Sequence, residues 1–501
     1  MRHSRAVEST LSSRHFDPQT VSCDTMNLRK IDDNIWEIPR EGEMKVPGRI
    51  YASEELIKSI RQDRTVEQIR NVSHLPGIYK YSIAMPDAHQ GYGFPIGGVA
   101  ALDVEDGGIS PGGVGYDINC GVRLVKTPLK TSDVTKRLKE LINTIFQKVP
   151  SGVGKSSNLS FSREELKEVI EEGASWAVEN GYGLEEDLEN MEEGGKMKEA
   201  DSSYVSDKAM NRGKNQVGCL GAGNHFLEIE NVGRIDDKQS ADSFGLFEDQ
   251  VCIMIHTGSR GFGHQVCTDY LREIEKKYKN KVRKLPDREL VYAPGGTEMA
   301  ERYFKAMSCA VNFAFANRQL IMHQVRKAFE EIFDLDYSDL ELVYDVCHNV
   351  AKKEKHTVDG DEKEVYVHRK GATRAFPPGH GKVPEKYRDV GQPVLIPGNM
   401  GEGSYLLRGN EDSMELSFGT APHGSGRIMS RTRAKGKFWG ETVKQDLMKE
   451  KGILVKAASM PVIAEEAPGA YKNLEEVVNA SHDVGVAKKV LKLDPMGVIK
   501  G

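Results

Sequence analysis

The sequence predicts an α+β fold with a mixed β-sheet core, ligand-bearing loops at the strand ends and helical insertions at the periphery. Short apolar runs typical of buried strands end directly in histidine or glycine, and amphipathic stretches typical of helices lie between them. By length alone, the 501 residues would suit roughly three domains. No linker rich in proline, glycine or serine divides the chain after residue 26, and we therefore expect one domain over residues 27–501.

The N-terminal segment, residues 1–26, is expected to be a disordered extension. It is polar, rich in serine and without hydrophobic periodicity. Its arginines and serines are also typical of an organelle transit peptide, whereas Glu8, Asp17 and Asp24 argue against one. We expect a cytoplasmic or nuclear protein and keep organelle targeting as the alternative.

Three segments are predicted to be helical. Ser162 and Glu165 have the spacing of a capping box, and Gly181 can end the helix that follows them. Residues 299–333 have the apolar periodicity of one long helix or two consecutive helices, and residues 473–490 have that of another.

Four short apolar runs predict strands that carry potential ligands at their ends. "VCIMI" and "LELVYDVC" run straight into His256 and His348, "VRLV" follows Cys120, and "PVLI" runs into a glycine-rich loop. Binding groups commonly occupy loops that a rigid scaffold holds in place. The strand ends are therefore the expected position of a functional site.

Composition narrows the class of protein. The seven cysteines form no C-x-x-C pair, which favours reduced thiols over disulfides. No apolar run approaches the ~20 residues of a membrane span, and we expect no membrane association. The net charge of -6 does not by itself indicate a nucleic-acid-binding protein.

The charged clusters of the sequence do not by themselves indicate a function. Basic clusters at 276–284, 368–374 and 426–437 could line a groove for a polyanion, although each cluster alone is typical of a solvated surface. The acidic stretch 185–195 is expected to be an exposed surface segment.

The stretch "GGVGYDINCG" (112–121) sets Asp117 and Cys120 three residues apart in a backbone with four glycines. A carboxylate and a thiolate together suit a divalent metal of intermediate softness. A tight turn around a buried cysteine explains the same residues, because free cysteine is among the most buried residue types. The stretch alone leaves both interpretations open.

Four more glycine-rich stretches carry polar or ionisable residues: "PDAHQGYGFPIGG" (86–98), "GAGNHFLEIE" (221–230), "HTGSRGFGHQ" (256–265) and "PHGSGR" (422–427). Loops of this kind can direct successive N–H groups at an anion. Neither a P-loop nor the H-E-x-x-H zinc spacing occurs in the chain. Glycine-rich loops that carry histidine, aspartate, cysteine and arginine give only weak support for a metal-dependent enzyme of phosphate chemistry, because a lone histidine is more often a surface or core residue than a ligand. A metal site would have to be assembled from distant segments.

Together with "SPGGVGYDINCGVRL", "CHN" (347–349), "HRKGATRAFPPG", "GEGSYLL", "EEAPGAYKN" and the C-terminal "VIKG", these stretches resemble the motifs of the RtcB-type RNA ligases. They occur in family order across the expected domain. The resemblance implies that residues 27–501 form an RtcB-like ligase domain, which joins 2′,3′-cyclic-phosphate or 3′-phosphate RNA ends to 5′-hydroxyl ends in tRNA splicing. The implied partners are tRNA halves, an archease-type activator and a complex that contains a DEAD-box helicase.

The resemblance assigns metal ligands. It implies two manganese ions held by Asp117, Cys120, His225, His256 and His348, with Cys120 as the bridge between them. Carboxylate suits manganese, imidazole is acceptable, and a bridging thiolate adds negative charge between two cations.

The resemblance also assigns nucleotide and RNA contacts. His423 is implied to attack GTP and form a covalent histidine–GMP intermediate, while Asp87 orients its imidazole. The residues implied to bind GTP are Asn224, His225, Phe226, Leu227, Glu228, His348, Asn349, Pro397, Gly398, Asn399, Met400, Ser404, His423, Gly424, Ser425, Gly426, Tyr471 and Lys500. The residues implied to hold RNA phosphates are Arg212, Arg260 and Arg431, because a guanidinium fork matches phosphate oxygens.

Two alternatives to ligation remain open from the sequence. A binuclear metal phosphodiesterase acting on cyclic phosphates needs the metal ligands but neither His423 nor Lys500. A non-catalytic RNA-binding subunit would tolerate loss of the metal ligands. The sequence also departs from the family pattern at Ala421-Pro422 and at Glu402, which bears on the shape of the loops near His423.

Overall fold

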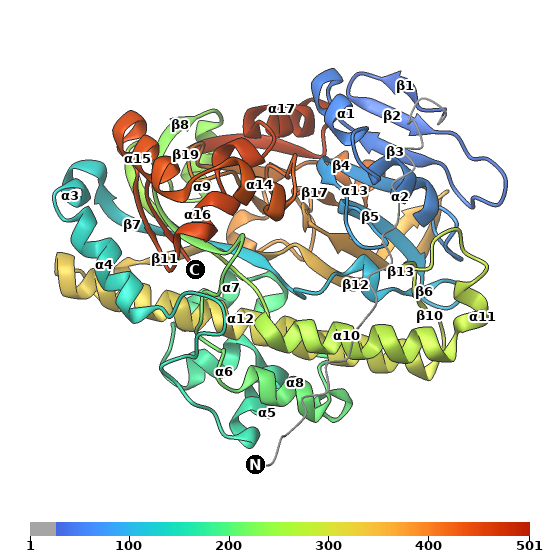
Figure 1. The fold of residues 1–501 in the computed structure, drawn as a ribbon, viewed down its shortest axis with the longest axis horizontal. Coiled ribbons are helices and arrows are strands. Elements are labelled where there is room, and N and C mark those ends of the chain that lie inside the picture. Colours follow the sequence, from blue (N-terminus) through green and yellow to red (C-terminus); the bar gives the residue numbers. More distant parts are fainter. Residues whose placement is uncertain (1–26) are drawn as a thin grey trace, which may run out of the picture.

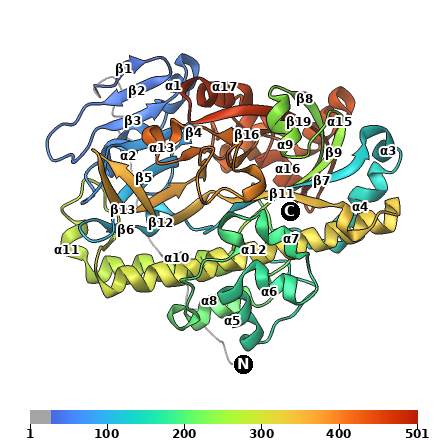
Figure 2. The ribbon, with the colours of Figure 1, turned by 180° about the vertical axis from the view of Figure 1, so that it is seen from behind.

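The computed structural model describes residues 27–501, and the expected N-terminal extension lies outside these residues. The prediction of an α+β fold is confirmed. Two large sheets, mostly antiparallel, lie side by side, and two long helices run beneath them (Figures 1 and 2). A smaller group of short helices lies on the far side of these long helices.

The first sheet contains the N-terminal strands and one later hairpin. Its order is β1–β2–β3–β4–β5–β13–β12, and every pair except β3–β4 is antiparallel. The strands are β1 (Arg29–Asp32), β2 (Ile35–Ile38), β3 (Gly48–Tyr51), β4 (Ser82–His89), β5 (Ile96–Asp103), β12 (Asn349–Val358) and β13 (Asp361–Lys370).

The second sheet has the order β11–β7–β9–β8–β19–β16–β15, with β18 pairing parallel to β19. Its strands are β7 (Gly121–Lys130), β8 (Phe226–Ile235), β9 (Gln250–Thr257), β11 (Glu341–Cys347), β15 (Pro393–Pro397), β16 (Ser404–Gly409), β18 (Leu454–Ala457) and β19 (Ala487–Lys500). The four predicted strands are therefore present, as β7, β9, β11 and β15. Two short pairs also form: β6 (Gly108–Ile109) with β10 (Ala293–Pro294), and β14 (Ala372–Arg374) with β17 (Thr420–Pro422).

The helices surround the sheets. They are α1 (Glu54–Ile60), α2 (Thr65–Val72), α3 (Thr131–Thr135), α4 (Leu138–Lys148), α5 (Arg163–Glu172), α6 (Ala174–Glu179), α7 (Glu185–Glu189), α8 (Asp207–Gly213), α9 (Lys238–Ser243), α10 (Arg260–Lys277), α11 (Lys279–Val282), α12 (Glu298–Phe333), α13 (Ser413–Ser417), α14 (Arg431–Lys437), α15 (Gly440–Lys451), α16 (Met460–Glu465) and α17 (Leu474–Val484). None of the helices in residues 27–501 combines the length and the apolar content that a membrane span requires.

The helix predicted over 299–333 forms as one continuous element, α12. It is buried along most of its length, and its apolar residues contribute to the largest hydrophobic core together with residues of β7, β8 and β9. A helix that is buried nearly all round must be enclosed by other elements of the fold. Here the sheets lie on one side of α12 and the short helices on the other (Figure 1).

Two helix predictions were wrong at their ends. The capping box of Ser162 and Glu165 begins α5, but the helix breaks at Gly173, whose φ of +63° favours glycine. The C-terminal helix ends before Gly485, whose φ is +93°, and the chain then enters β19 rather than continuing as a helix to residue 490. In both cases a glycine with positive φ ends the helix earlier than the apolar periodicity suggested.

The acidic stretch 185–195 is exposed only in part: Glu185, Glu186 and Glu189 are exposed as expected, whereas two other carboxylates of the stretch are not. Asp187 is buried and pairs with Arg326 of α12, with both oxygen–nitrogen distances at 2.7 Å. Glu192 is also buried, 2.6 Å from the ammonium of Lys352. Charges that look solvated in the sequence are here neutralised by partners 139 and 160 positions away.

Candidate active site

The predicted ligands meet at one edge of the second sheet. In the register of its strands, Gly121 lies opposite both Thr257 and Cys347, and Phe226 lies opposite His256. The first residues of β7 and β8 therefore lie beside the last residues of β9 and β11. The strand pairing alone places together four predicted ligands that are at or next to these positions: Cys120, His225, His256 and His348.

The turn before β7 brings Asp117 and Cys120 to the same side. The N–H of Cys120 donates to the carbonyl of Asp117 at 2.9 Å, and Asn119 between them has a φ of +50°, which asparagine tolerates better than most residues. The buried Arg318 of α12 holds this turn by donating to the Asn119 carbonyl at 3.0 Å. A Cβ on Gly258 would lie 2.5 Å from Asp117 Oδ1, so a glycine there lets the end of β9 approach the turn.

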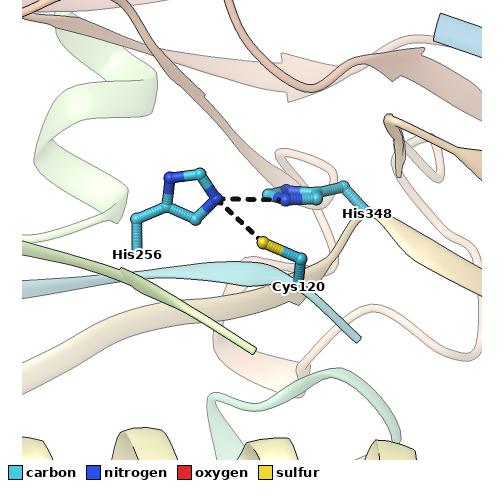
Figure 3. Close-up of side chains that lie close together, drawn as sticks. All are labelled: Cys120, His256 and His348. Atoms are coloured by element: carbon cyan, nitrogen blue, oxygen red, sulfur yellow. Dashed lines mark hydrogen bonds between the residues drawn. The ribbon is translucent and has the colours of Figure 1, made fainter. Parts of the chain in front are cut away.

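Three imidazoles gather around the sulfur of Cys120. Its Sγ lies 3.4 Å from His225 Nε2. The same sulfur lies 3.2 Å from His256 Nε2, which in turn lies 3.2 Å from His348 Nε2 (Figure 3). Asp117 Oδ2 lies 2.8 Å from His225 Nε2. The five predicted ligands thus form two possible metal-binding groups that share only Cys120.

The donor set fits cations. Asp117 Oδ1, His256 Nδ1 and His348 Nδ1 are buried, and none has a hydrogen-bond partner in the part of the chain that the structure describes. Burial lowers the pKa of all three imidazoles, and burial together with Asp117 raises the pKa of the Cys120 thiol. Neutral imidazoles, a carboxylate and a thiol in one buried cluster suit divalent metals, which favour the thiolate.

His225 illustrates how the protein sets the tautomer of a predicted ligand. Its Nδ1 lies 3.1 Å from the Leu220 carbonyl, and donation there leaves the Nε2 lone pair directed at Asp117 and Cys120. Arg260, predicted to hold RNA phosphate, has a guanidinium nitrogen 2.7 Å from the same Nδ1. One ring nitrogen cannot both donate to Leu220 and accept from Arg260, so the tautomer that suits a metal leaves the guanidinium free for an anion.

His423 adjoins the cluster. It follows β17, its ring centroid lies 4.8 Å from that of His348, and its Nδ1 lies 2.6 Å from Oδ2 of the completely buried Asp87. The backbone N–H of His423 donates to the same oxygen at 3.2 Å. The carboxylate therefore fixes the ring with Nδ1 protonated and the Nε2 lone pair available. Gly426, with a φ of +73°, permits this approach, because a Cβ there would lie 2.0 Å from the Asp87 carbonyl oxygen.

A cavity of about 1110 Å³ connects the metal-binding groups, His423 and the predicted nucleotide residues. Most of the predicted nucleotide set lines it: Asn224, His225, Phe226, Glu228, His348, Asn349, Pro397, Gly398, Asn399, Met400, His423, Gly424, Ser425, Gly426, Tyr471 and Lys500. Arg212, Arg260 and Arg431 line it as well. Leu227 and Ser404 do not, because the side chain of Leu227 packs in the hydrophobic core and Ser404 is completely buried beside Met254.

The predicted guanine contacts form a buried cluster of charges. Burial raises the pKa of Glu228 to about 7, although Lys500 opposes this shift. The Lys500 ammonium lies 3.7 Å from Glu466 and donates to the Gly223 carbonyl at 3.3 Å. Burial lowers the pKa of Lys500, and Glu466 and Glu228 oppose that change. Tyr471 donates a hydrogen bond to Glu466.

Sequence reasoning missed two residues that support the site. Glu466, inside the "EEAPGAYKN" motif, is buried and pairs with Arg427 at 3.1 Å as well as with Lys500. Lys472, in the same motif, donates to the two backbone carbonyls on either side of Asp87, at 3.2 and 2.5 Å. Their partners lie far away in the chain, so the motif was visible in the sequence but these contacts were not.

The two departures from the family pattern are accommodated locally. A proline at 422 restricts the residue before it to extended backbone, and Ala421 lies in strand β17. Glu402 accepts from the N–H of Leu474, the first residue of α17, at 3.3 Å. A carboxylate at a helix N-terminus is favourable.

The fold and this cavity define a class of protein: an α+β protein whose cleft brings together side chains suited to bind divalent cations. Comparison with known proteins makes the class specific. A family model described as tRNA-splicing ligase RtcB matches residues 68–501. A tRNA-splicing ligase RtcB from Thermococcus kodakarensis is 55% identical over 95% of this chain and 99% of its own length. Those from Methanococcus maripaludis and Nanoarchaeum equitans are 55% and 51% identical over 95% of this chain, with 99% and 100% of their own lengths covered. The chain belongs to the RtcB family, as its motifs indicated.

Proposed function

We propose that this protein is a GTP- and manganese-dependent RNA ligase that joins 2′,3′-cyclic-phosphate or 3′-phosphate ends to 5′-hydroxyl ends in tRNA splicing. The observation that carries the proposal is the setting of His423. It lines the cavity between a buried carboxylate, 2.6 Å from its Nδ1, and the cluster that contains His348. An imidazole so held is a nucleophile with one free nitrogen, placed beside groups suited to bind cations.

In the proposed first step, Nε2 of His423 attacks the α-phosphorus of GTP. A phosphorus–nitrogen bond forms, the bond to the bridging oxygen breaks, and pyrophosphate leaves. Asp87 stabilises the positive charge that the ring gains. Asp117, Cys120 and His225 would hold one manganese ion, and Cys120, His256 and His348 the other. Such ions supply charge neutralisation at phosphate oxygens.

Recognition of GTP is assigned to the buried charges of the cavity. An ionised Glu228 can accept from the guanine N–H groups, and adenine lacks that donor pattern. Tyr471 and Lys500 line the same cavity, and Glu466 contacts both of them. Asn224 lies 2.9 Å from Arg431, which connects the nucleotide contacts to the arginines proposed to bind RNA phosphates.

The later steps use the activated end of the RNA. A cyclic phosphate is first hydrolysed to a 3′-phosphate, and GMP is then transferred from His423 to that phosphate. The 5′-hydroxyl of the second fragment attacks the activated phosphate and expels GMP. Arg212, Arg260 and Arg431 provide the positive charge that positions the two strands.

The same proposal includes partners and location. An archease-type activator and a complex that contains a DEAD-box helicase are the proposed partners. The six cysteines in residues 27–501 are free and buried, which supports a reducing compartment such as the cytoplasm or nucleus.

The test is incubation with GTP labelled at the α-phosphate, in the presence of manganese, followed by denaturing electrophoresis. We expect label on the wild-type chain, none with γ-labelled GTP, and none on His423→Ala with its metal content intact. His74→Ala is the matched control, because His74 is a partly exposed histidine that does not line the cavity. A phosphodiesterase would cleave cyclic phosphates without becoming labelled, and a non-catalytic subunit would do neither.

A further inference from the structure

Three aromatic rings in the cavity have no part in the proposed nucleotide chemistry. Tyr92, between β4 and β5, contacts Tyr116 edge to face with ring centroids 6.0 Å apart. Tyr116 stacks with His264 of α10 at 5.9 Å and an interplanar angle of 24°. We call these three residues the aromatic ladder. All three line the cavity.

The ladder is open to the cavity. Tyr116 is 38% exposed, although Gly115 before it is buried and Asp117 after it is half-buried. His264 is exposed as well, and Tyr92 is half-buried. A tyrosine that presents its ring to a cavity offers a surface on which another flat group can stack.

Positive charge accompanies the ladder. Arg212 and Arg260 also line the cavity. Gln265, the next residue along α10, accepts from Arg212 at 3.1 Å and so holds it beside the ladder. Rings next to guanidinium groups bind single-stranded nucleic acid, since bases stack on the rings and phosphates contact the cations.

We propose that the aromatic ladder binds an unpaired nucleobase at an RNA end by stacking on Tyr116, while Arg212 and Arg260 hold the adjoining phosphates. The inference rests on the proposed function and names the residues that deliver the RNA end. Tyr116 directly precedes the predicted ligand Asp117, so a base stacked on it brings its own phosphate next to the metal-binding groups. Because every base has a flat face, the ladder accepts any sequence.

The experiment uses the full chain with manganese and short RNAs that carry 2-aminopurine as the last nucleotide. One arm carries it at a 5′-hydroxyl end and the other at a 3′-phosphate end. Stacking quenches its fluorescence, so the quenched arm identifies the end that the ladder holds. We expect Tyr116→Ala to bind that RNA roughly 5- to 150-fold more weakly and to lose the quenching. The weaker binding should appear as a higher KM for RNA. Tyr116→Trp should retain both affinity and quenching.

Phe247→Ala is the matched control, because Phe247 is also 38% exposed but does not line the cavity, and it should bind like wild type. His264→Ala, which is not adjacent to a predicted ligand in the chain, should weaken binding in the same direction as Tyr116→Ala. If wild type ligates RNA but quenches neither arm, or if both alanine variants keep its affinity and KM, the ladder proposal is overturned. If wild type neither labels with GTP nor ligates, the proposed function has failed instead.

Discussion

Replacing Asp87 by asparagine tests the contact on which the proposed chemistry depends. Asp87 Oδ2 accepts from both Nδ1 and the backbone N–H of His423, at 2.6 and 3.2 Å. The amide of asparagine can be placed in two orientations. With its carbonyl oxygen toward His423 it accepts the same two hydrogen bonds, whereas with its amino group toward His423 it would place a donor against two donors, so the first orientation is favoured. The substitution should therefore keep the orientation of the imidazole and remove only the charge.

The expected decrease in the rate of guanylylation follows from the geometry of this contact. Hydrogen bonds to charged groups contribute about 1.5–3 kcal/mol, and this one lies in a completely buried position where the ring becomes positive during attack. Losing about 2–3 kcal/mol of transition-state stabilisation slows guanylylation roughly 30- to 150-fold. The assay is single-turnover labelling with α-labelled GTP at saturating manganese, with quenched time points. Metal content should not change, because Asp87 lies outside both metal-binding groups.

Asp63→Asn is the matched control for this variant. Its carboxylate accepts from the backbone N–H of Gln90, in the loop that follows β4, at 2.8 Å, and it does not line the cavity. It should label at the wild-type rate. If Asp87→Asn also labels at the wild-type rate, with a normal melting temperature, then Asp87 is not the group that stabilises the charged imidazole.

Three further predictions follow from the site. Cys120→Ala should lower manganese content and ligation together, because both metal-binding groups share its sulfur; two ions per chain in the variant, measured by mass spectrometry, would contradict the bridging role. Burial raises the pKa of Glu228 to about 7, and only the ionised carboxylate can accept from guanine. The affinity for GTP should therefore increase about tenfold for each unit by which the pH is raised toward 7 and level off above pH 7, and this dependence should vanish in Glu228→Gln. Deleting Lys500 and Gly501 should weaken GTP binding roughly tenfold or more, while the melting temperature changes little. If labelling of this variant depends on GTP concentration as it does in wild type, these two residues make no nucleotide contact.

Local patterns explain how much of this site was predictable. Apolar runs that stop at His256 and His348 are visible in the sequence, because a strand and its end are set by neighbouring residues. That these ends face each other depends on pairings among β7, β8, β9 and β11, which join residues as distant in the chain as Gly121 and Cys347. From the sequence, only the resemblance to a family indicated that these distant residues belong to one site. The aromatic ladder combines three separate segments without a pattern that relates them, and it became visible only in three dimensions.

The C-terminal residues show why such long-range pairing matters for the proposed function. Terminal residues are usually mobile unless they are tied down, yet Lys500 ends strand β19, with Phe226 of β8 opposite it on one side and Ala457 of β18 on the other. Its ammonium is therefore delivered to Glu466 and Glu228 by two strands rather than by a flexible tail. Most of β19 would remain paired without its last two residues. Loss of the chain end should thus remove a charge from the nucleotide contacts and leave intact the sheet that carries the predicted metal ligands.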